Sequence, residues 1–397
     1  MGIDNGARLT TLRLRSDDEG ASPLVTARRF DRIAITSVFG HPSDPKTWSG
    51  APKNLGRALE ELGIVVEGIS PRISRPKRLA LAARYLVAGY GRLRRTEQLL
   101  RAGPARRRHA RQIADCVSRT DIRHVLHTGT LDLPALDLAR GIKHYLYCDH
   151  TWLLSLRHRP DASAFTAKAV ADFERLEKES FAGLDAIFTF GTYVRDHIVQ
   201  HYGVPPERVI AVGSGMGSIE PFRGPKDFSR PRLLFVAKHL FEAKGGLLLL
   251  DAFHLALRRR PDLLLTIVGD QRSRAFVPQH PNIVFHDHLP WPELQKLYHE
   301  ATLLTQPMLN DPWGQVYLEA LVSRTPVLGL KRNGLPEITG GGSYGFLVKA
   351  AKPQSVADAI VDAAGDPDRL ARMADDGQRH VLANYSWDRV AERIGLV

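Results

Sequence analysis

The stretch that decides how this chain folds is Asp311-Pro312-Trp313-Gly314-Gln315-Val316-Tyr317-Leu318-Glu319. Two carboxylates stand eight residues apart, with a glycine between them and a helical pattern behind. Proline is tolerated in the first turn of a helix, because its missing N–H would have no partner there. We therefore expect Asp311 at the N-cap of a helix that carries Glu319 two turns in.

Such a helix start offers a binding site. The backbone N–H groups of Gln315 and Val316 are free at a positive helix end, which favours an anion. Gly314 lets a ligand approach the backbone closely. Glu319 is suited to accept hydrogen bonds from the diol of a sugar or a ribose. The alternative, which the spacing leaves open, is a well-capped core helix with one partly exposed glutamate.

The longer stretch resembles a known family of enzymes. The chain from Asp311 to Ile338, with its turn Gly334-Leu335-Pro336-Glu337, resembles the E-x7-E region of the family 4 retaining glycosyltransferases. Those enzymes have the GT-B fold and use nucleotide-sugar donors. The resemblance covers about residues 33–394. It implies that Asp311 holds the hydroxyls of the donor sugar and that Glu319 holds the ribose.

Two positions depart from the family pattern. Asp311 replaces the usual first glutamate, which shortens the reach of the carboxylate by one methylene. Arg324 stands where the family normally has a glycine at the helix end, and a residue other than glycine is strained in a left-handed cap by roughly 1–2 kcal/mol. We therefore expect this turn to differ from the turn of the family.

Length and composition bound the class of protein. A chain of 397 residues is too long for one ordinary core, so two domains are expected. No apolar run approaches the roughly 18 residues of a membrane span. Residues 1–30 lack the apolar core of a signal peptide and are expected to form a flexible tail. Cys116 and Cys148 provide neither a disulfide framework nor metal-ligand spacing. A cytoplasmic location fits these features.

Positive charge is concentrated in residues 72–111, which hold thirteen Lys or Arg against one acidic residue, Glu97. This excess of twelve equals the net charge of the whole chain. One or two basic amphipathic helices, broken near Gly103-Pro104, would contact an anionic membrane peripherally on its inner face, or an acidic acceptor. A solvated helical face is the alternative. Nucleic acid is not an expected partner, because aromatic residues are sparse among the arginines.

The first half of the chain alternates strands and helices. Residues 32–36 and 64–66 are expected strands around a helix at 54–63, without a G-x-G-x-x-G fingerprint. The loop from Trp48 to Pro52 resembles the family's first loop, so its Gly50 is expected to lie against the donor or the acceptor; a simple turn is the alternative.

Another strand, residues 144–148, leads into His150. Ligands of open α/β sheets bind beyond the carboxyl ends of strands, and the resemblance implies that His150 contacts the donor sugar. A structural, hydrogen-bonded histidine is the alternative.

A second domain is expected after a linker rich in proline and glycine. Its first strand, residues 232–236, leads to Lys238 and Lys244 on a loop that enters a helix. Two lysines and free helix N–H groups suit a diphosphate. The loop resembles the family's G-R-…-K-G phosphate loop, with Ala237 in place of the glycine and Lys238 in place of the arginine. An ordinary loop with surface lysines is the alternative.

We therefore predict the α/β class, with two Rossmann-like domains facing across a cleft in the GT-B arrangement. The expected parts are the tail (residues 1–30), an acceptor-side domain (31–222), a nucleotide-sugar domain (223–382) and a C-terminal helix (383–397) that returns to the first domain.

The resemblance implies a hexosyltransferase that moves a sugar, with retention of configuration, from a nucleoside diphosphate sugar to a hydroxyl of a glycan, a lipid-linked acceptor or a small molecule. Lys238, Lys244 and the helix end near Gly314 would stabilise the leaving diphosphate, so neither a cofactor nor a metal is expected. Two alternatives stay open. One is a sugar epimerase or phosphorylase on the same fold, and the other is a non-catalytic GT-B protein that binds an anionic surface.

Overall fold

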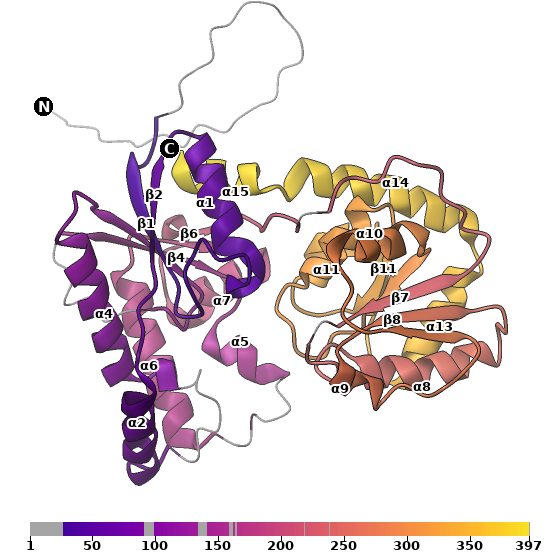
Figure 1. Ribbon diagram of the computed structural model, residues 1–397, viewed down its shortest axis with the longest axis horizontal. Coiled ribbons are helices and arrows are strands. Elements are labelled where there is room, and N and C mark those ends of the chain that lie inside the picture. The colour runs from indigo at the N-terminus through magenta and orange to yellow at the C-terminus, as the bar shows by residue number, and fades with distance from the viewer. Residues whose placement is uncertain are drawn as a thin grey trace, which may run out of the picture.

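The computed structural model describes residues 27–90, 99–133, 141–158, 162, 165–217, 219–237 and 239–396. Figure 1 shows two lobes, each built around a central sheet with helices packed on it. Each sheet has six strands, and all of the pairings between them are parallel. The predicted pair of Rossmann-like domains is confirmed.

The N-terminal sheet has the strand order β2-β1-β3-β4-β5-β6. Its four inner strands have buried centres, as expected for a parallel sheet covered on both faces, whereas the edge strands β2 and β6 are only partly buried. The strands are β1 (Arg32–Thr36), β2 (Val65–Ile69), β3 (His124–Thr128), β4 (Lys143–Cys148), β5 (Ala186–Thr189) and β6 (Val209–Ala211). The helices are η1 (Thr47–Gly50), α1 (Ala51–Glu61), α2 (Arg75–Val87), α4 (Gly103–Val117), α5 (Trp152–Arg157), α6 (Ala167–Gly183), α7 (Thr192–Tyr202) and η4 (Pro206–Arg208).

The C-terminal sheet has the order β12-β11-β10-β7-β8-β9. Its strands are β7 (Arg232–Val236), β8 (Leu264–Val268), β9 (Ile283–His286), β10 (Leu303–Thr305), β11 (Val327–Leu330) and β12 (Gly345–Val348). The helices are α8 (Gly246–Leu257), α9 (Gln271–Arg274), α10 (Trp291–Glu300), α11 (Gln315–Val322), α12 (Leu335–Ile338), η5 (Gly340–Gly342), α13 (Pro353–Ala364) and α14 (Pro367–Asn384).

The strand order reverses at one point in each sheet. In the first sheet the chain runs from β1 to β2 on one side and then returns to β3 on the other; in the second sheet, β7 and β10 flank the corresponding point. Ligands of such sheets bind beyond the carboxyl ends of the strands at this switch point. The loops that follow β7 and β10 are the ones that carry Lys244 and Asp311.

The last helix, α15 (Trp387–Gly395), packs against the first domain, as Figure 1 shows. The backbone N–H of Arg29 donates to the carbonyl of Gly395 at 2.8 Å. The indole N–H of Trp387 donates to the carbonyl of Met216 at 2.8 Å. A Cβ at Gly395 would lie 2.7 Å from Ile64, so α15 approaches the first domain closely. The chain therefore crosses between the domains twice, at the linker after β6 and at α15.

The basic segment does not form one continuous charged surface. The side chains of Arg101 and Arg106 are only 7% and 2% exposed. Arg101 pairs with the fully buried Glu177 at 3.6 Å, and Arg106 donates to the hydroxyl of Ser180 at 2.9 Å. The prediction of an anionic partner is therefore wrong for these two arginines, because they fasten the start of α4 to α6. Residues 91–98 of the segment lie outside the described part of the chain. Within the described ranges, no helix is both long enough and apolar enough to cross a membrane.

Candidate functional site

The helix after Asp311 begins later than the sequence suggests. Its first residue is Gln315 and its N-cap is Gly314, with φ 79°, so the prediction that Asp311 is the N-cap is wrong. Gly314 can adopt the left-handed backbone that turns the chain into the helix, and a Cβ there would lie 2.7 Å from the ring of Tyr317. The Asp311 carboxylate instead accepts from the backbone N–H of Trp313 at 3.2 Å. It thereby closes a turn ahead of the helix.

The loop with Lys244 lies directly against the loop with Asp311. The carbonyl of Ala243 accepts from the backbone N–H groups of Leu309 and Asn310, at 2.9 and 3.0 Å. Gly245, with φ 88°, is the N-cap of α8, and a Cβ there would lie 2.0 Å from the carbonyl oxygen of Pro307. This close backbone contact requires glycine.

The ammonium of Lys244 donates to the carboxylate of Asp311, and the two side chains are only 21% and 20% exposed. Two residues predicted separately, one for the diphosphate and one for the sugar, therefore meet in one ion pair at the switch point of the second sheet. Lys238, the other predicted phosphate ligand, lies outside the described residues.

One face of α11 points at the loop that follows β6. The side-chain amide of Gln315 donates to the carbonyl of Gly215 at 3.2 Å. Glu319 lies one turn further along the same face, and a Cβ on Gly217 would lie 2.6 Å from its Oε1. Gln315 and Glu319 therefore both lie against the segment that links the domains. Val316, next to Gln315, is half-buried and packs on the main apolar cluster.

Glu319 is more buried than a surface glutamate, at 8% exposure. The hydroxyl of Tyr298 donates to its Oε2 at 2.9 Å. Burial raises the pKa of Tyr298 well above its ordinary value, and the neighbouring Glu319 carboxylate raises it further. The tyrosine therefore stays protonated and donates to the carboxylate.

His150 follows β4, and Tyr193 connects it to the other domain. The Tyr193 hydroxyl lies 3.5 Å from Nδ1 of His150 and donates to the carbonyl of Pro312 at 2.6 Å. Burial lowers the pKa of His150 to about 3, so its imidazole is neutral near pH 7. Burial, together with the nearby Asp311 carboxylate, raises the pKa of Asp149 to about 7. The structure thus brings His150 close to the Asp311 loop.

Gly50 occupies an unusual turn on the side of the first domain. Trp48, Ser49 and Gly50 are consecutive residues with left-handed φ values of 42°, 55° and 81°. The Trp48 ring lies 5.2 Å from the ring of Phe190, which in turn lies 6.0 Å from Trp313. The turn is therefore connected to the Asp311 loop through aromatic side chains. Among the described residues, no hydrogen bond or ion pair joins Gly50 to the other predicted site residues.

The sequence did not reveal a carboxylate that joins the two domains. One oxygen of Glu337 accepts from both the backbone N–H and the hydroxyl of Thr192, at 2.7 and 2.6 Å. Glu337 thus caps the N-terminus of α7 from the opposite domain. The side-chain amide of Asn333 donates to the carbonyl of Asp311 at 2.8 Å. The turn from Gly334 to Glu337 was visible in the sequence, but its partner lies 145 residues away.

The turn at Arg324 keeps the left-handed backbone, with φ 54°, so the expectation that it would differ is wrong. The guanidinium donates to Asp375 at 2.7 Å and to the carbonyl of Gly224 at 2.8 Å. These bonds offset the strain of a residue other than glycine at this position.

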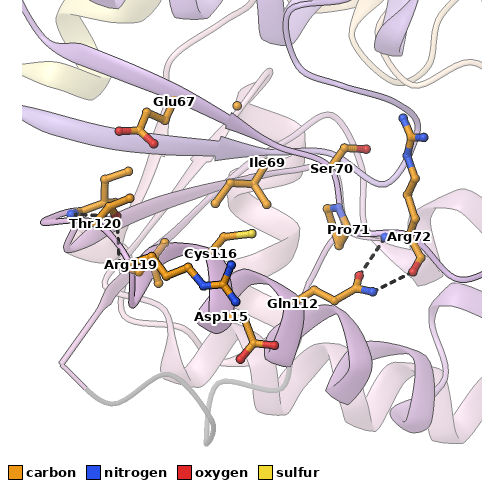
Figure 2. A pocket seen from close by; sticks show the side chains of 13 residues that line it. Glu67, Ile69, Ser70, Pro71, Arg72, Gln112, Asp115, Cys116, Arg119 and Thr120 are labelled. Carbon is orange, nitrogen blue, oxygen red and sulfur yellow. Dashed lines mark hydrogen bonds between the residues drawn. The ribbon is translucent and has the colours of Figure 1, made fainter.

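One cavity, of about 590 Å³, lies away from all of these residues. It is between β2 and α4, and Glu67, Asp115 and Cys116 are among its lining side chains (Figure 2). None of the residues predicted for the site lines it. We therefore do not assign the functional site to this cavity, despite its volume, because no candidate residue lines it.

Two family models match this chain, one in each domain. The model described as Glycosyltransferase Family 4 matches residues 53–216, and the model described as Glycosyl transferases group 1 matches residues 230–366. The alpha-maltose-1-phosphate synthase of Mycolicibacterium smegmatis is 26% identical over 252 residues, which are 55% of this chain and 64% of that protein. A D-inositol 3-phosphate glycosyltransferase of Thermobispora bispora is 28% identical over 228 residues, which are 50% of this chain and 52% of that protein. The matches span less than two thirds of these relatives.

Solved structures have the same fold over nearly the whole chain. Sucrose-phosphate synthase from Thermosynechococcus elongatus matches with a TM-score of 0.71 and 16% identity, over 92% of this chain and 97% of that one. Anabaena Alr3699/HepE in complex with UDP-glucose matches with a TM-score of 0.62 and 14% identity, over 91% and 98%. The fold is therefore GT-B, and the homologues of this chain are glycosyltransferases.

Proposed function

We propose that this chain is a glycosyltransferase that moves a sugar from a nucleoside diphosphate sugar to an acceptor hydroxyl. The observation that carries the proposal is the ion pair of Lys244 and Asp311 at the switch point of the second sheet, beside the N-terminus of α11. A cation and free helix N–H groups suit a diphosphate, and a carboxylate suits sugar hydroxyls. The glycosyltransferase matches in both domains support the same activity.

We assign the roles by position in the structure, except that the role of Lys238 rests on the sequence alone. Lys244, Lys238 and the backbone N–H groups of Gln315 and Val316 would bind the diphosphate and stabilise the charge that develops on it as the bond to the sugar breaks. Asp311 and His150 would orient the donor sugar. Glu319 would bind the ribose, and Gly50 would let the donor or acceptor approach α1 closely.

The chemistry of this site supports transfer without a metal. The ammonium of Lys244 supplies positive charge where a diphosphate would leave, which is the task that a metal ion performs in other phosphate sites. We propose retention of anomeric configuration, which follows from the family resemblance. Proton NMR of the newly formed product would test it, because an inverted anomeric coupling would contradict retention. Full activity after exhaustive chelation would support independence from metal.

The first activity assay should use UDP-glucose, because one of the structural neighbours was solved with it. Labelled donor would be incubated with glycans, lipid-linked saccharides and small polyols, and transfer would be separated from hydrolysis and isomerisation by chromatography. Transfer that depends on the acceptor supports the proposal. Isomerised donor would indicate an epimerase, phosphate-dependent release of sugar from a glycan would indicate a phosphorylase, and the absence of any turnover would favour a binding protein.

We also propose that α2 makes a peripheral contact with an anionic membrane. Three large apolar side chains on this helix are exposed: Leu79 by 72%, Leu86 by 53% and Val87 by 90%. Basic residues on the same helix, among them Arg75 and Arg84, are also exposed. Apolar side chains flanked by cations are typical of helices that lie in a membrane interface.

Vesicle co-sedimentation tests this contact. The double variant Leu86→Ser with Val87→Ser should lose binding to anionic vesicles, whereas Leu382→Ser, which changes a 40% exposed leucine on α14, should keep it. Equal binding of wild type to neutral and anionic vesicles, or to neither, would refute the contact.

A further inference from the structure

A second cavity, of about 580 Å³, lies at the carboxyl ends of β1 and β2. The loop from Val38 to Gly40, the loop from Ser70 to Ser74, and residues of α2 and α4 form its walls. Four of its lining residues are cationic, and none is acidic; the cations are Arg72, Lys77, Arg78 and Arg108. This cavity is called the cationic pocket below. Its composition favours an anionic ligand.

Hydrogen-bond donors in the wall of the pocket lack partners. The buried atoms Ser70 Oγ, Arg78 Nε and Arg108 Nε make no hydrogen bond within the described part of the chain. Nor does any of the four cations form an ion pair with a described carboxylate, whereas the buried Arg101 nearby pairs with Glu177. Buried donors normally have partners, so those in this wall require an explanation. An anion with several acceptor oxygens would supply the missing partners.

The neighbouring cavity of about 590 Å³ provides an internal contrast. It shares Ser70 and Arg72 with the cationic pocket, but its wall also contains Glu67 and Asp115. Gln112 accepts from the backbone N–H of Arg72 at 2.8 Å and donates to the Arg72 carbonyl at 2.9 Å. Figure 2 shows that this leaves the Arg72 guanidinium extending away from Gln112 and Cys116. The two hydrogen bonds to Gln112 therefore hold the backbone of Arg72 and leave its guanidinium without a bond to Gln112.

The end of α2 adds to the positive character of the pocket. Ser74 is the N-cap of this 13-residue helix, but its side chain makes no capping hydrogen bond. Ser74 also lines the pocket, so the positive end of α2 lies at its wall. Guanidinium groups match phosphate oxygens with two parallel hydrogen bonds, which makes arginine well suited to phosphate.

We propose that the cationic pocket binds a phosphate group of the acceptor, so that this glycosyltransferase acts on a phosphorylated acceptor. The proposal rests on the proposed function and adds the substrate class to it. The pocket and His150 lie at the same edge of the first sheet, because each follows the carboxyl end of a parallel strand. The order β2-β1-β3-β4 puts the ends of β1 and β2 two and three strand spacings from the end of β4, which is roughly 10–15 Å across the sheet at about 4.8 Å per spacing. The body of an acceptor can span that interval with its phosphate in the pocket and a hydroxyl near the donor.

Inorganic phosphate is the first probe, in calorimetric titrations of the full chain. Arg78→Gln and Arg108→Gln should each weaken phosphate binding by about tenfold, the loss expected for one charge-assisted pair. Arg111→Gln, on the exposed side of α4, is the matched control and should bind phosphate as wild type does. Arg78→Lys keeps the charge but cannot make the two parallel hydrogen bonds of a guanidinium, so its affinity for phosphate should be intermediate. Circular dichroism would establish that the variants are folded.

Two further arms separate this pocket from the donor site. Lys244→Met should retain phosphate binding in the pocket, and both glutamine variants should retain the affinity of wild type for a nucleoside diphosphate. Phosphate binding that is lost in Lys244→Met, or that is unchanged in Arg78→Gln and Arg108→Gln, would overturn the proposal. Titration with nucleoside diphosphates tests the donor site independently. The proposal of a phosphate site in the pocket can therefore be refuted while the proposed function holds.

The source of the phosphate is settled by two ligands tested side by side. If the acceptor is a soluble sugar phosphate, the glutamine variants lose affinity for a hexose phosphate but still sediment with phosphatidylcholine vesicles that contain phosphatidic acid. If it is a lipid phosphate beside α2, the same variants lose the part of vesicle binding that depends on phosphatidic acid. Weaker binding of either ligand by the glutamine variants supports a phosphate site in the pocket. Unchanged binding of both ligands overturns it.

Discussion

The ammonium of Lys244 and the carboxylate of Asp311, 67 residues apart in the chain, form an ion pair between the loops that follow β7 and β10. Both side chains are about four-fifths buried, so the pair is less screened than a surface pair. The pair places a cation for the diphosphate beside a carboxylate for the sugar. Replacing Lys244 should therefore weaken binding of the diphosphate, whereas replacing Asp311 should slow the transfer of the sugar.

The first prediction concerns the two partners of this pair. Lys244→Met should weaken nucleoside diphosphate binding by about tenfold or more, because a charge-assisted contact to the phosphates is lost. Asp311→Asn should leave that affinity unchanged or increase it, because the carboxylate competes for the ammonium, but it should lower turnover. Calorimetry on both single variants and the double variant would measure this. Normal affinity in Lys244→Met would contradict the assignment.

The second prediction concerns the contact between Glu337 and Thr192. Glu337→Gln should lower the free energy of unfolding by about 1–2 kcal/mol, because it weakens the cap of α7 that comes from the other domain. The control is Glu392→Gln, whose pairing with Arg389 is exposed and should matter little. Chemical denaturation of both variants gives the comparison. Equal stability would mean that the interdomain cap contributes nothing measurable.

The third prediction tests the close contact between the two site loops. Gly245→Ala should be strongly destabilising and should abolish nucleotide binding, because its Cβ would lie 2.0 Å from the carbonyl oxygen of Pro307. Gly141→Ala is a matched control: Gly141 has a similar φ of 77° but nothing lies within 4 Å of the added Cβ. It should cost only the strain of a left-handed alanine, roughly 1–2 kcal/mol. Thermal unfolding should show a larger fall in Tm for Gly245→Ala than for Gly141→Ala. Equal falls in Tm would contradict the prediction.

The fourth prediction concerns pH. Asp132 is fully buried, its carboxylate accepts from the hydroxyl of Thr36, and burial raises its pKa from 3.8 to about 7. The folded protein therefore binds one more proton than the unfolded chain between these pH values. The stability that this carboxyl contributes is present below pH 3.8 and is lost as the pH rises to 7.

Asp132→Asn removes that titration. Between pH 4 and pH 7 the free energy of unfolding of the variant should rise relative to wild type, by up to about 4 kcal/mol. Above pH 8 the difference should stay constant. Unfolding measured at a series of pH values gives this difference directly. A difference that does not change with pH would mean that the carboxyl is not protonated in the folded protein.

The fold could be predicted from the sequence because its signals are local. Apolar runs followed by helical patterns, such as residues 232–236 before Lys244, specify a strand and its crossover helix. The loops with Lys244 and Asp311 could be assigned because each follows such a strand, and the topology then brings them together. The helix start was predicted wrongly because proline spacing favours Asp311 as the cap, whereas Gly314 alone accommodates the left-handed turn against Tyr317.

The remaining features depend on contacts that no local pattern contains. Glu337 meets Thr192, and Tyr193 meets Pro312, only because the two domains pack together. The buried Arg101 pairs with Glu177, and the buried Arg106 donates to Leu176 and Ser180, all of which lie about 70 residues or more further along the chain. Charge counting cannot distinguish such arginines from the unpaired ones of the cationic pocket.

The most direct test of the central claim is calorimetric titration with UDP, GDP, ADP and TDP, without metal, on wild type, Glu319→Gln and Tyr298→Phe. One nucleotide should bind wild type selectively, and Glu319→Gln should bind it about tenfold more weakly, because a carboxylate that accepts from the ribose is lost. Tyr298→Phe removes only the hydroxyl that donates to Glu319, so its effect should be smaller. The absence of binding by any of the four nucleotides, or equal affinity in Glu319→Gln, would contradict the assigned donor site.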